Sequence, residues 1–238
     1  MKKSWIIFAA LAMLFMAAGA SADSLQVNNT AAMGGTGTAC GGSNCGLEVL
    51  HDNTSAAYVQ DNTPTDESVY RGSFLFNPNN ISPETGNFRQ VLFSGVGTNP
   101  NPGNFSCPAG ANINVFRIWG YFTGGSGQIY NVQMWGAGNQ CGNRGTSRIS
   151  ISKDQPVRIC WEWTTGSANT GTIALATTAI ADPCPTSGDG AWVTNTLSNQ
   201  NTDLDLVRLG TPATNNFGVG ENGSMYYDEF ESFRTLSP

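Results

Sequence analysis

Twelve short runs of β-forming residues, separated by clusters of glycine, asparagine and proline, occupy the sequence from residue 46 to residue 233. Alternating apolar and polar side chains within these runs are typical of strands with one buried face. After the first 22 residues, no ten-residue window has apolar residues at the three-and-four spacing of a helix. The runs are 46–52, 56–61, 68–76, 88–95, 113–123, 127–135, 146–152, 156–164, 172–178, 191–196, 204–210 and 224–233. Their even spacing predicts an all-β fold, a two-layer antiparallel β-sandwich.

The first 22 residues have the features of a secretory signal peptide. Lys2 and Lys3 give a basic start, and residues 5–18 form an apolar run that is short for a membrane span. Residues 20–22, Ala-Ser-Ala, match the small-residue pattern of a cleavage site. We therefore expect a secreted or periplasmic protein without a membrane span.

The remaining chain divides into a lead-in and one folded domain. Residues 23–45 are rich in glycine and asparagine and predict a flexible segment, which could hold an edge strand at residues 25–27. Residues 46–238 contain all twelve runs and no linker, which predicts a single sandwich domain.

Six cysteines follow the predicted signal peptide. An even number in an exported chain predicts disulfides, and six cysteines allow 15 pairings. Cys40 and Cys45 would close a short loop, and Cys107 and Cys141 stand at the open ends of a predicted hairpin, which leaves Cys160 with Cys184. The alternative of a zinc site has little support, because the sequence has no CxxC pair and a single histidine, His51.

The charge of the chain argues against nucleic acid as a partner. Its 17 acidic side chains, against the 9 basic ones left without Lys2 and Lys3, give a net charge of −8. Such a chain would repel phosphate backbones. Charged residues make up only 12% of the sequence, so we expect a neutral, polar surface rich in amides and hydroxyls.

Two predicted hairpins carry large side chains on both faces. In the hairpin at residues 113–135, a two-residue turn at Gly125 and Ser126 would place Tyr121 opposite Tyr130, whereas a three-residue loop would flip one strand to the other face. With the two-residue turn, the apolar face would hold Phe116, Ile118, Phe122 and Ile129, and the other face Arg117, Trp119, Tyr121, Tyr130 and Met134. In the second hairpin, residues 156–178, one face would hold Ile159, Trp161 and Trp163, and the other Arg158, Cys160 and Glu162.

The polar aromatic face of the first hairpin suggests a binding site. Aromatic rings with polar tips beside arginine and amide groups are typical of surfaces that bind sugars or flat ligands. The alternative is that loops or another strand cover this face. The residues predicted to bind a ligand are Arg117, Trp119, Tyr121, Tyr130, Arg158 and Glu162.

Three stretches resemble the concanavalin A-like lectin/glucanase jelly roll, close to its laminin-G-like branch. They are residues 66–81 (DESVYRGSFLFNPNNI), 156–175 (PVRICWEWTTGSANTGTIAL) and 223–234 (GSMYYDEFESFR), the last similar to the final strand of the family. The resemblance implies an antiparallel sandwich whose concave face binds glycans in many members. It also implies that a structural calcium ion could be present, although no calcium motif appears in the sequence.

The last stretch raises the question of catalytic carboxylates. Apolar residues at positions 225–227, 230 and 233 do not alternate cleanly, so we expect a bulge near Asp228 and Glu229 that returns Tyr227 and Phe230 to the core. Adjacent strand residues point to opposite faces, so Asp228 and Glu229 do not form an acid–base pair. Asp228 is expected to accept a hydrogen bond from backbone amides.

No complete catalytic motif is found. The sequence lacks the Glu-x-Asp-x-Glu string of jelly-roll glucanases and a G-x-S-x-G elbow. The first hypothesis is therefore a secreted, non-catalytic, lectin-like module that binds a glycan or surface polymer. A polysaccharide lyase or glycosidase that uses His51, Tyr227 or Glu162 is one alternative, and a structural or adhesive envelope protein that self-associates is another. The oligomeric state stays open.

Overall fold

The computed structural model describes residues 26–28, 33–34, 47–51, 56–79, 87–97, 113–123, 130–137, 144–200, 202–212 and 223–235. The predicted signal peptide and Cys40, Cys45, Cys107 and Cys141 lie outside these residues, so the signal peptide and two of the three disulfides stay predictions. Over the described ranges, none of the secondary structure is a helix with the length and apolar character needed to cross a membrane.

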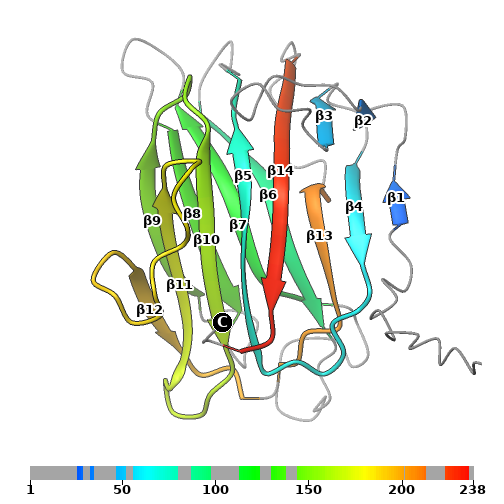
Figure 1. Ribbon diagram of the computed structural model, residues 1–238. Helices are drawn as coiled ribbons and strands as arrows, with labels where there is room; N and C mark the ends of the chain where they lie inside the picture. Colours follow the sequence, from blue (N-terminus) through cyan, green and yellow to red (C-terminus); the bar gives the residue numbers. More distant parts are fainter. Residues whose placement is uncertain are drawn as a thin grey trace, which may run out of the picture.

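The described strands form two antiparallel sheets that stack face to face (Figure 1). In the first sheet the order is β1 (Gln26–Asn28), β4 (Ala57–Asp61), β13 (Leu206–Thr211), β6 (Asn87–Gly97), β7 (Ile113–Thr123), β8 (Tyr130–Ala137) and β9 (Arg144–Ile151). In the second sheet it is β12 (Val193–Leu197), β11 (Gly171–Thr178), β10 (Val157–Thr164), β5 (Val69–Asn77), β14 (Gly223–Phe233), β3 (Leu47–His51) and β2 (Met33–Gly34). The prediction of an all-β, two-layer antiparallel sandwich is confirmed.

Each of the twelve predicted runs overlaps one strand, from β3 to β14. The lead-in contributes two short edge strands: β1 pairs with β4 in the first sheet, and β2 pairs with β3 in the second. The division of the chain into a segment at residues 23–45 and a domain at residues 46–238 stays a prediction.

Aromatic rings fill the space between the two sheets. In β10, Trp161 and Trp163 are fully buried, as the alternation of this strand predicts. The ring of Trp161 lies 4.5 Å from that of Phe93 in the first sheet and 5.6 Å from that of Phe74 in the second, measured between ring centroids. These tilted contacts hold the inner faces of both sheets together.

The predicted bulge in β14 is confirmed. The pairing of β14 with β5 shifts register between Asp228 and Glu231, and Glu229 adopts a positive φ of 47°. The extra residue returns Phe230 to the core, where its ring contacts Phe93 at 5.7 Å. The carboxylate of Asp228 accepts a hydrogen bond of 2.7 Å from the backbone amide of Glu229, which is a structural role for this side chain.

The register of the hairpin formed by β7 and β8 differs from the two-residue turn. Phe122, not Tyr121, lies opposite Tyr130, and Trp119 lies opposite Gln133. This slip by one residue turns β8 over, which is the outcome expected for a longer loop. Tyr130 and Met134 therefore face the core, and they are 1% and 0% exposed.

A disulfide joins Cys160 of β10 to Cys184 in the loop that follows β11. Cys160 and Cys184 were predicted to pair once the other four cysteines were paired with each other, and this prediction is confirmed. The bond lies on the outer face of the second sheet and fixes the loop to that face.

The aromatic layer predicts a large loss of stability when its central ring is removed. Replacing Trp161 by alanine would leave a cavity between the sheets, and we expect the free energy of unfolding to fall by about 3–5 kcal/mol. Denaturant unfolding followed by tryptophan fluorescence measures this change. The matched control is Val193→Ala on β12, where the side chain is 41% exposed and the change should stay within about 0.5 kcal/mol. Equal effects of the two substitutions would contradict the central role of Trp161.

Candidate functional site

The outer face of the first sheet is strongly basic. The seven strands of this sheet contain five arginines and one acidic residue, Asp61, whereas the whole chain has a net charge of −6. Because Phe116 and Ile118 of β7 are buried, the alternate residues of this strand point outward. Residues directly opposite in neighbouring strands share that face. We call this surface the basic face; it holds Tyr58, Arg89, Arg117, Trp119, Tyr121, Gln133, Trp135, Arg148 and Arg208.

Tyr121 lies between two guanidinium groups on the basic face. Arg89, directly opposite on β6, has its Cζ 5.3 Å from the centroid of the Tyr121 ring, and Arg148 on β9 has its Cζ 5.0 Å from it. Both arginines are exposed and Tyr121 is half-buried. Among the described residues, Arg89 and Arg148 form no salt bridge with a carboxylate.

Further along the face, arginines again pair with aromatic rings. The Cζ of Arg117 lies 5.5 Å from the Trp119 ring and 6.0 Å from the Trp135 ring. Across β6, the guanidinium of Arg208 lies 5.0 Å from the Tyr58 ring, and its Nε donates a 2.7 Å hydrogen bond to Gln60. The basic face thus offers rings that can stack on sugars and N–H groups that can bind carboxylates.

The structure brings together only half of the predicted ligand-binding residues. Arg117, Trp119 and Tyr121 share the basic face and are each half-buried. Tyr130 was predicted to join them, but the register of β8 buries it in the core. Trp135 and Gln133 take its place, because the slipped strand turns them outward.

Arg158 and Glu162 lie on the other side of the sandwich. Both point outward from β10, which belongs to the second sheet. The sequence predicted the outward direction of these side chains correctly, but it assigned them to the same surface as Arg117. A single site that contains all six residues is therefore ruled out.

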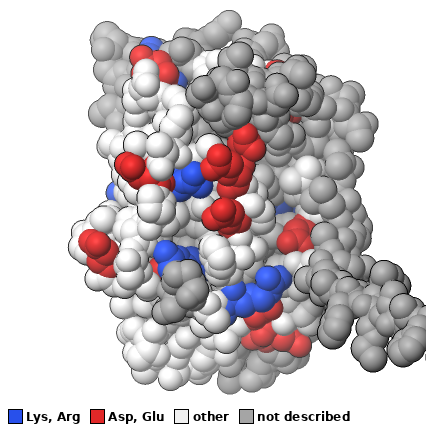
Figure 2. All heavy atoms as spheres, viewed as in Figure 1, with Lys and Arg blue, Asp and Glu red and all other residues white. Residues whose placement is uncertain are grey.

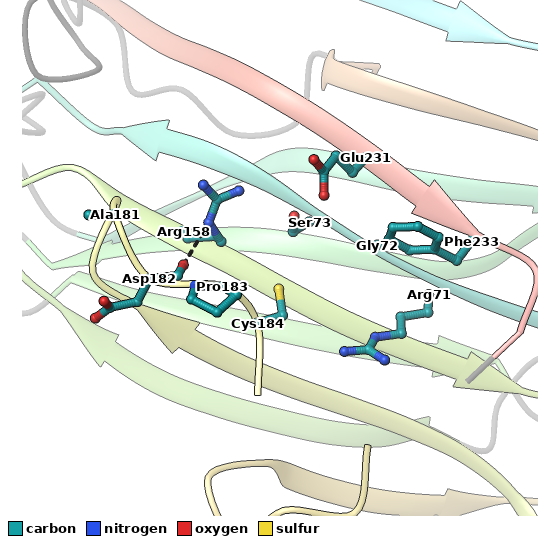
Figure 3. A pocket seen from close by; sticks show the side chains of 10 residues that line it. All are labelled: Arg71, Gly72, Ser73, Arg158, Ala181, Asp182, Pro183, Cys184, Glu231 and Phe233. Atoms are coloured by element: carbon teal, nitrogen blue, oxygen red, sulfur yellow. Dashed lines mark hydrogen bonds between the residues drawn. The ribbon is translucent and has the colours of Figure 1, made fainter. Parts of the chain in front are cut away.

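The outer face of the second sheet holds a pocket of about 390 Å³ (Figure 3). Basic and acidic side chains lie side by side on this face (Figure 2). Arg158 is fully engaged there: its Nε donates to the carbonyl of Asp182 at 3.0 Å, and its Nη2 contacts the carbonyl of Ile180 at 3.1 Å and Glu229 Oε2 at 2.6 Å. This arginine therefore acts first as a structural clamp.

Glu162 is buried beside this pocket. Arg71 Nε lies 3.5 Å from its Oε1, and Ser187 Oγ donates a 3.0 Å hydrogen bond to its Oε2. Burial raises the pKa of the Glu162 carboxyl, while the Ser187 hydrogen bond and the charge of Arg71 act in the opposite direction. Removal from solvent is the dominant effect.

The residues proposed for catalysis in the sequence do not converge. Tyr227 is fully buried, with its hydroxyl 3.9 Å from Met225 Sδ, and burial raises its pKa well above the usual range. His51 ends β3 with its backbone paired to Gly223, in the second sheet and away from the basic face. Within the described ranges, no group of three histidine, cysteine or acidic side chains is arranged to hold a metal ion. A structural calcium ion stays a prediction.

Arg89, Arg148, Arg208 and Tyr58 were not among the predicted site residues. Arg89, Arg148 and Arg208 are each the only basic residue of their β-run, and Tyr58 is the only aromatic residue of its run. Only the order of β4, β13, β6, β7, β8 and β9 in the sheet brings them onto one surface. In sequence, Arg208 and Tyr58 stand between apolar residues, which indicates that they face away from the core, whereas Arg89 and Arg148 each have one polar neighbour.

Two solved structures with a similar fold are polysaccharide lyases. An endo-β-1,4-glucuronan lyase from the fungus Trichoderma reesei is 13% identical, with a TM-score of 0.59 over 91% of this chain and 92% of that chain. A marine alginate lyase from Aplysia kurodai is 11% identical, with a TM-score of 0.56 over 90% of each chain. No protein-family model matches the sequence, and no curated protein matches it. The comparisons show a jelly-roll β-sandwich, compatible with the concanavalin A-like architecture.

These neighbours correct the first functional hypothesis. The chain was predicted to be a non-catalytic, lectin-like module, with a non-enzyme favoured over an enzyme, and both predictions are contradicted by structural neighbours that are lyases. The findings favour the alternative of a polysaccharide lyase.

The buried Glu162 predicts how stability depends on pH. Its pKa is raised above the usual value of 4.5, so the folded protein keeps a proton that the unfolded chain has already lost. The contribution of Glu162 to the stability of the wild type therefore falls as the pH rises from 4.5 through the raised pKa.

In Glu162→Gln this pH-dependent loss is absent. We expect the free energy of unfolding of the variant to increase relative to that of the wild type over the same pH range. Loss of the contact with Arg71 also changes the stability of the variant by an amount that does not depend on this titration. The quantity to measure is therefore how the difference in the free energy of unfolding between variant and wild type changes with pH, by urea denaturation at a series of pH values. A difference that stays constant or decreases with pH would contradict the prediction.

Proposed function

We propose that this protein is a polysaccharide lyase that cleaves an acidic, uronate-containing polymer on the basic face. The observation that carries the proposal is the position of Tyr121 between the guanidinium groups of Arg89 and Arg148, at 5.3 Å and 5.0 Å from its ring. β-Elimination from a uronate needs a group that transfers protons and groups that stabilise the charge on the carboxylate, and this arrangement could supply both.

The charge distribution supports an acidic substrate. The four arginines of the basic face, on a chain with a net charge of −6, would create a local positive potential that attracts a polyanion. Guanidinium groups also recognise carboxylates through pairs of parallel hydrogen bonds. A neutral polymer would gain neither of these contributions.

In the proposed reaction, a base removes the proton on C5 of the uronate, and the electron pair forms a double bond between C4 and C5. The C4–O bond to the leaving sugar breaks, and that oxygen takes up a proton. Arg89 and Arg148 would bind the uronate carboxylate and stabilise the charge that develops on it. The Tyr121 Oη would accept the C5 proton as the base and pass a proton to the leaving oxygen as the acid, so that the group ends in the state in which it began.

The remaining aromatic residues give the polymer a path across the sheet. Trp119 and Trp135 would stack on sugar rings next to the reacting unit, with Arg117 between them binding a further carboxylate. Tyr58 and Arg208 extend this path across β13 to β4. The two lyases of similar fold named above act, by their descriptions, on glucuronan and alginate, which supports a uronate polymer as the substrate class.

Export would bring such an enzyme to its polymer. The signal-peptide pattern and the disulfide between Cys160 and Cys184 support a secreted or periplasmic protein. Membership of the laminin-G-like branch stays a prediction from the resemblance of the sequence.

The first test replaces the Tyr121 hydroxyl and keeps its ring. The wild type should produce unsaturated sugar ends, detected by ultraviolet absorbance, from glucuronan or alginate and none from a neutral glucan. Tyr121→Phe should lower kcat by at least about a hundredfold, the usual contribution of a proton-transfer group. Tyr226→Phe, on the second sheet, is the matched control and should keep wild-type activity. The absence of unsaturated product from both acidic polymers would overturn the proposal.

A second test addresses the guanidinium groups. Arg148 is exposed, so Arg148→Gln should fold normally and should lower kcat/KM on the acidic polymer by about tenfold or more, through the lost carboxylate contact. Because one positive charge is removed from the face, the salt dependence of KM should also become weaker. Unchanged kcat/KM with unchanged salt dependence would exclude Arg148 from substrate binding.

A further inference from the structure

The pocket beside Arg158 lies on the opposite side of the sandwich from the basic face. It opens between β14, β5, β10 and the loop after β11, and about 390 Å³ of space lies within it. Figure 3 shows Glu231 and Phe233 of β14 on one side, Ser73 of β5 in the middle and Pro183 and Cys184 of the loop on the other side. This volume is near the lower end of the range for small-molecule sites, enough for one or two sugar rings.

The wall formed by the loop is rigidly attached to the sheet. The disulfide ties Cys184 to Cys160, Arg158 binds two carbonyl groups of the loop, and Arg71 Nη2 donates a 2.9 Å hydrogen bond to the carbonyl of Pro185. A wall that is fixed before the ligand arrives lowers the entropy cost of binding.

The charges in the pocket favour a ligand without negative charge. Arg71 is paired with Glu162 at 3.5 Å, and Arg158 is paired with Glu229 at 2.6 Å. Glu231 is exposed, and no salt bridge among the described residues involves it. With both arginines already paired, Glu231 leaves the pocket with a negative charge that would repel a uronate.

The strand that supplies Glu231 and Phe233 is bent to present them. The bulge at Glu229, where φ is 47°, shifts the register so that both side chains face outward beside Ser73 and Arg71. Phe233 is 40% exposed, which makes it one of two strongly exposed large apolar side chains in the described part of the chain. An exposed ring beside a carboxylate and a hydroxyl offers stacking together with hydrogen-bond acceptors for hydroxyl groups.

We propose that this pocket is a second saccharide site, which binds a neutral sugar unit. The ring of Phe233 would stack on the apolar face of the sugar, and Glu231 and Ser73 would bind its hydroxyl groups. That the ligand is a saccharide rests on the proposed function, whereas its neutrality follows from the paired arginines. The protein would then hold the acidic part of a polymer on one face and a neutral unit on the other.

The test titrates the isotope-labelled protein with short neutral oligosaccharides, namely cello-, xylo-, manno- and galacto-oligosaccharides, and with an oligouronate as the charged comparator. Chemical shifts observed by NMR report which amides respond. At least one neutral oligosaccharide should shift signals of β14, β5 and the Ala181–Cys184 loop. Phe233→Ala should weaken this binding by about tenfold or more, and Glu231→Gln, which keeps the shape of the side chain, should weaken it by a smaller factor.

Val193→Ala is the matched control, because it removes an equally exposed apolar side chain on β12 of the same sheet, outside the pocket. It should bind the neutral sugar as the wild type does. Absence of binding to every neutral oligosaccharide, unchanged binding by Phe233→Ala, or stronger binding of the oligouronate in the pocket would each overturn the proposal.

Cleavage of glucuronan and alginate is measured on the same variants. Phe233→Ala should cleave these polymers at the wild-type rate, since its side chain lies on the opposite sheet. A protein that binds neutral sugar but cleaves no uronate polymer would refute the proposed function alone. A protein that cleaves but binds no neutral sugar would refute the second site alone.

Discussion

The contact between the two sheets through a layer of aromatic rings determines everything that lies on their outer faces. The ring centroids of Trp161 in one sheet and Phe93 in the other lie 4.5 Å apart. Successive residues of a strand point to opposite faces, so when one residue is held in the core, its neighbours in sequence point outward. Arg158 is outward because Ile159 and Trp161 are inward, and Arg117 is outward because Phe116 and Ile118 are inward. The functional surfaces are thus a consequence of how the core is packed.

Alternation within a single strand was sufficient to predict much of this arrangement. The positions of apolar residues in β10 predicted which of its side chains point into the core. In β14 the same argument predicted a bulge, because Tyr227 and Phe230 can both be buried only if an extra residue stands between them. The register between β7 and β8 could not be predicted in the same way. It depends on the length of the loop between them, and a glycine-rich stretch such as residues 123–128 permits several loop lengths with little difference in energy.

Which residues come together in the candidate site was harder to predict from the sequence. Arg89, Tyr121 and Arg148 come from β6, β7 and β9, and they meet only because of the order and stagger of those strands. Arg158 and Glu162 carry the same local pattern as Arg117 and Trp119, yet β10 belongs to the other sheet. Alternation within a strand predicts which side chains point outward. It does not predict which sheet the strand joins, because strand pairing depends on contacts between residues distant in sequence.

The arginines of the two sheets differ in what they leave available to a ligand. On the second sheet, the N–H groups of Arg71 and Arg158 bind loop carbonyls and the carboxylates of Glu162 and Glu229. These two arginines therefore attach the loop after β11 to the sheet. On the first sheet, Arg89 and Arg148 rest against the ring of Tyr121. Stacking on a ring uses the flat face of a guanidinium and leaves the N–H groups at its edge free to bind a carboxylate. The same residue type therefore has a structural role on one face, and on the other it is placed where the proposed function needs it to bind an anionic sugar.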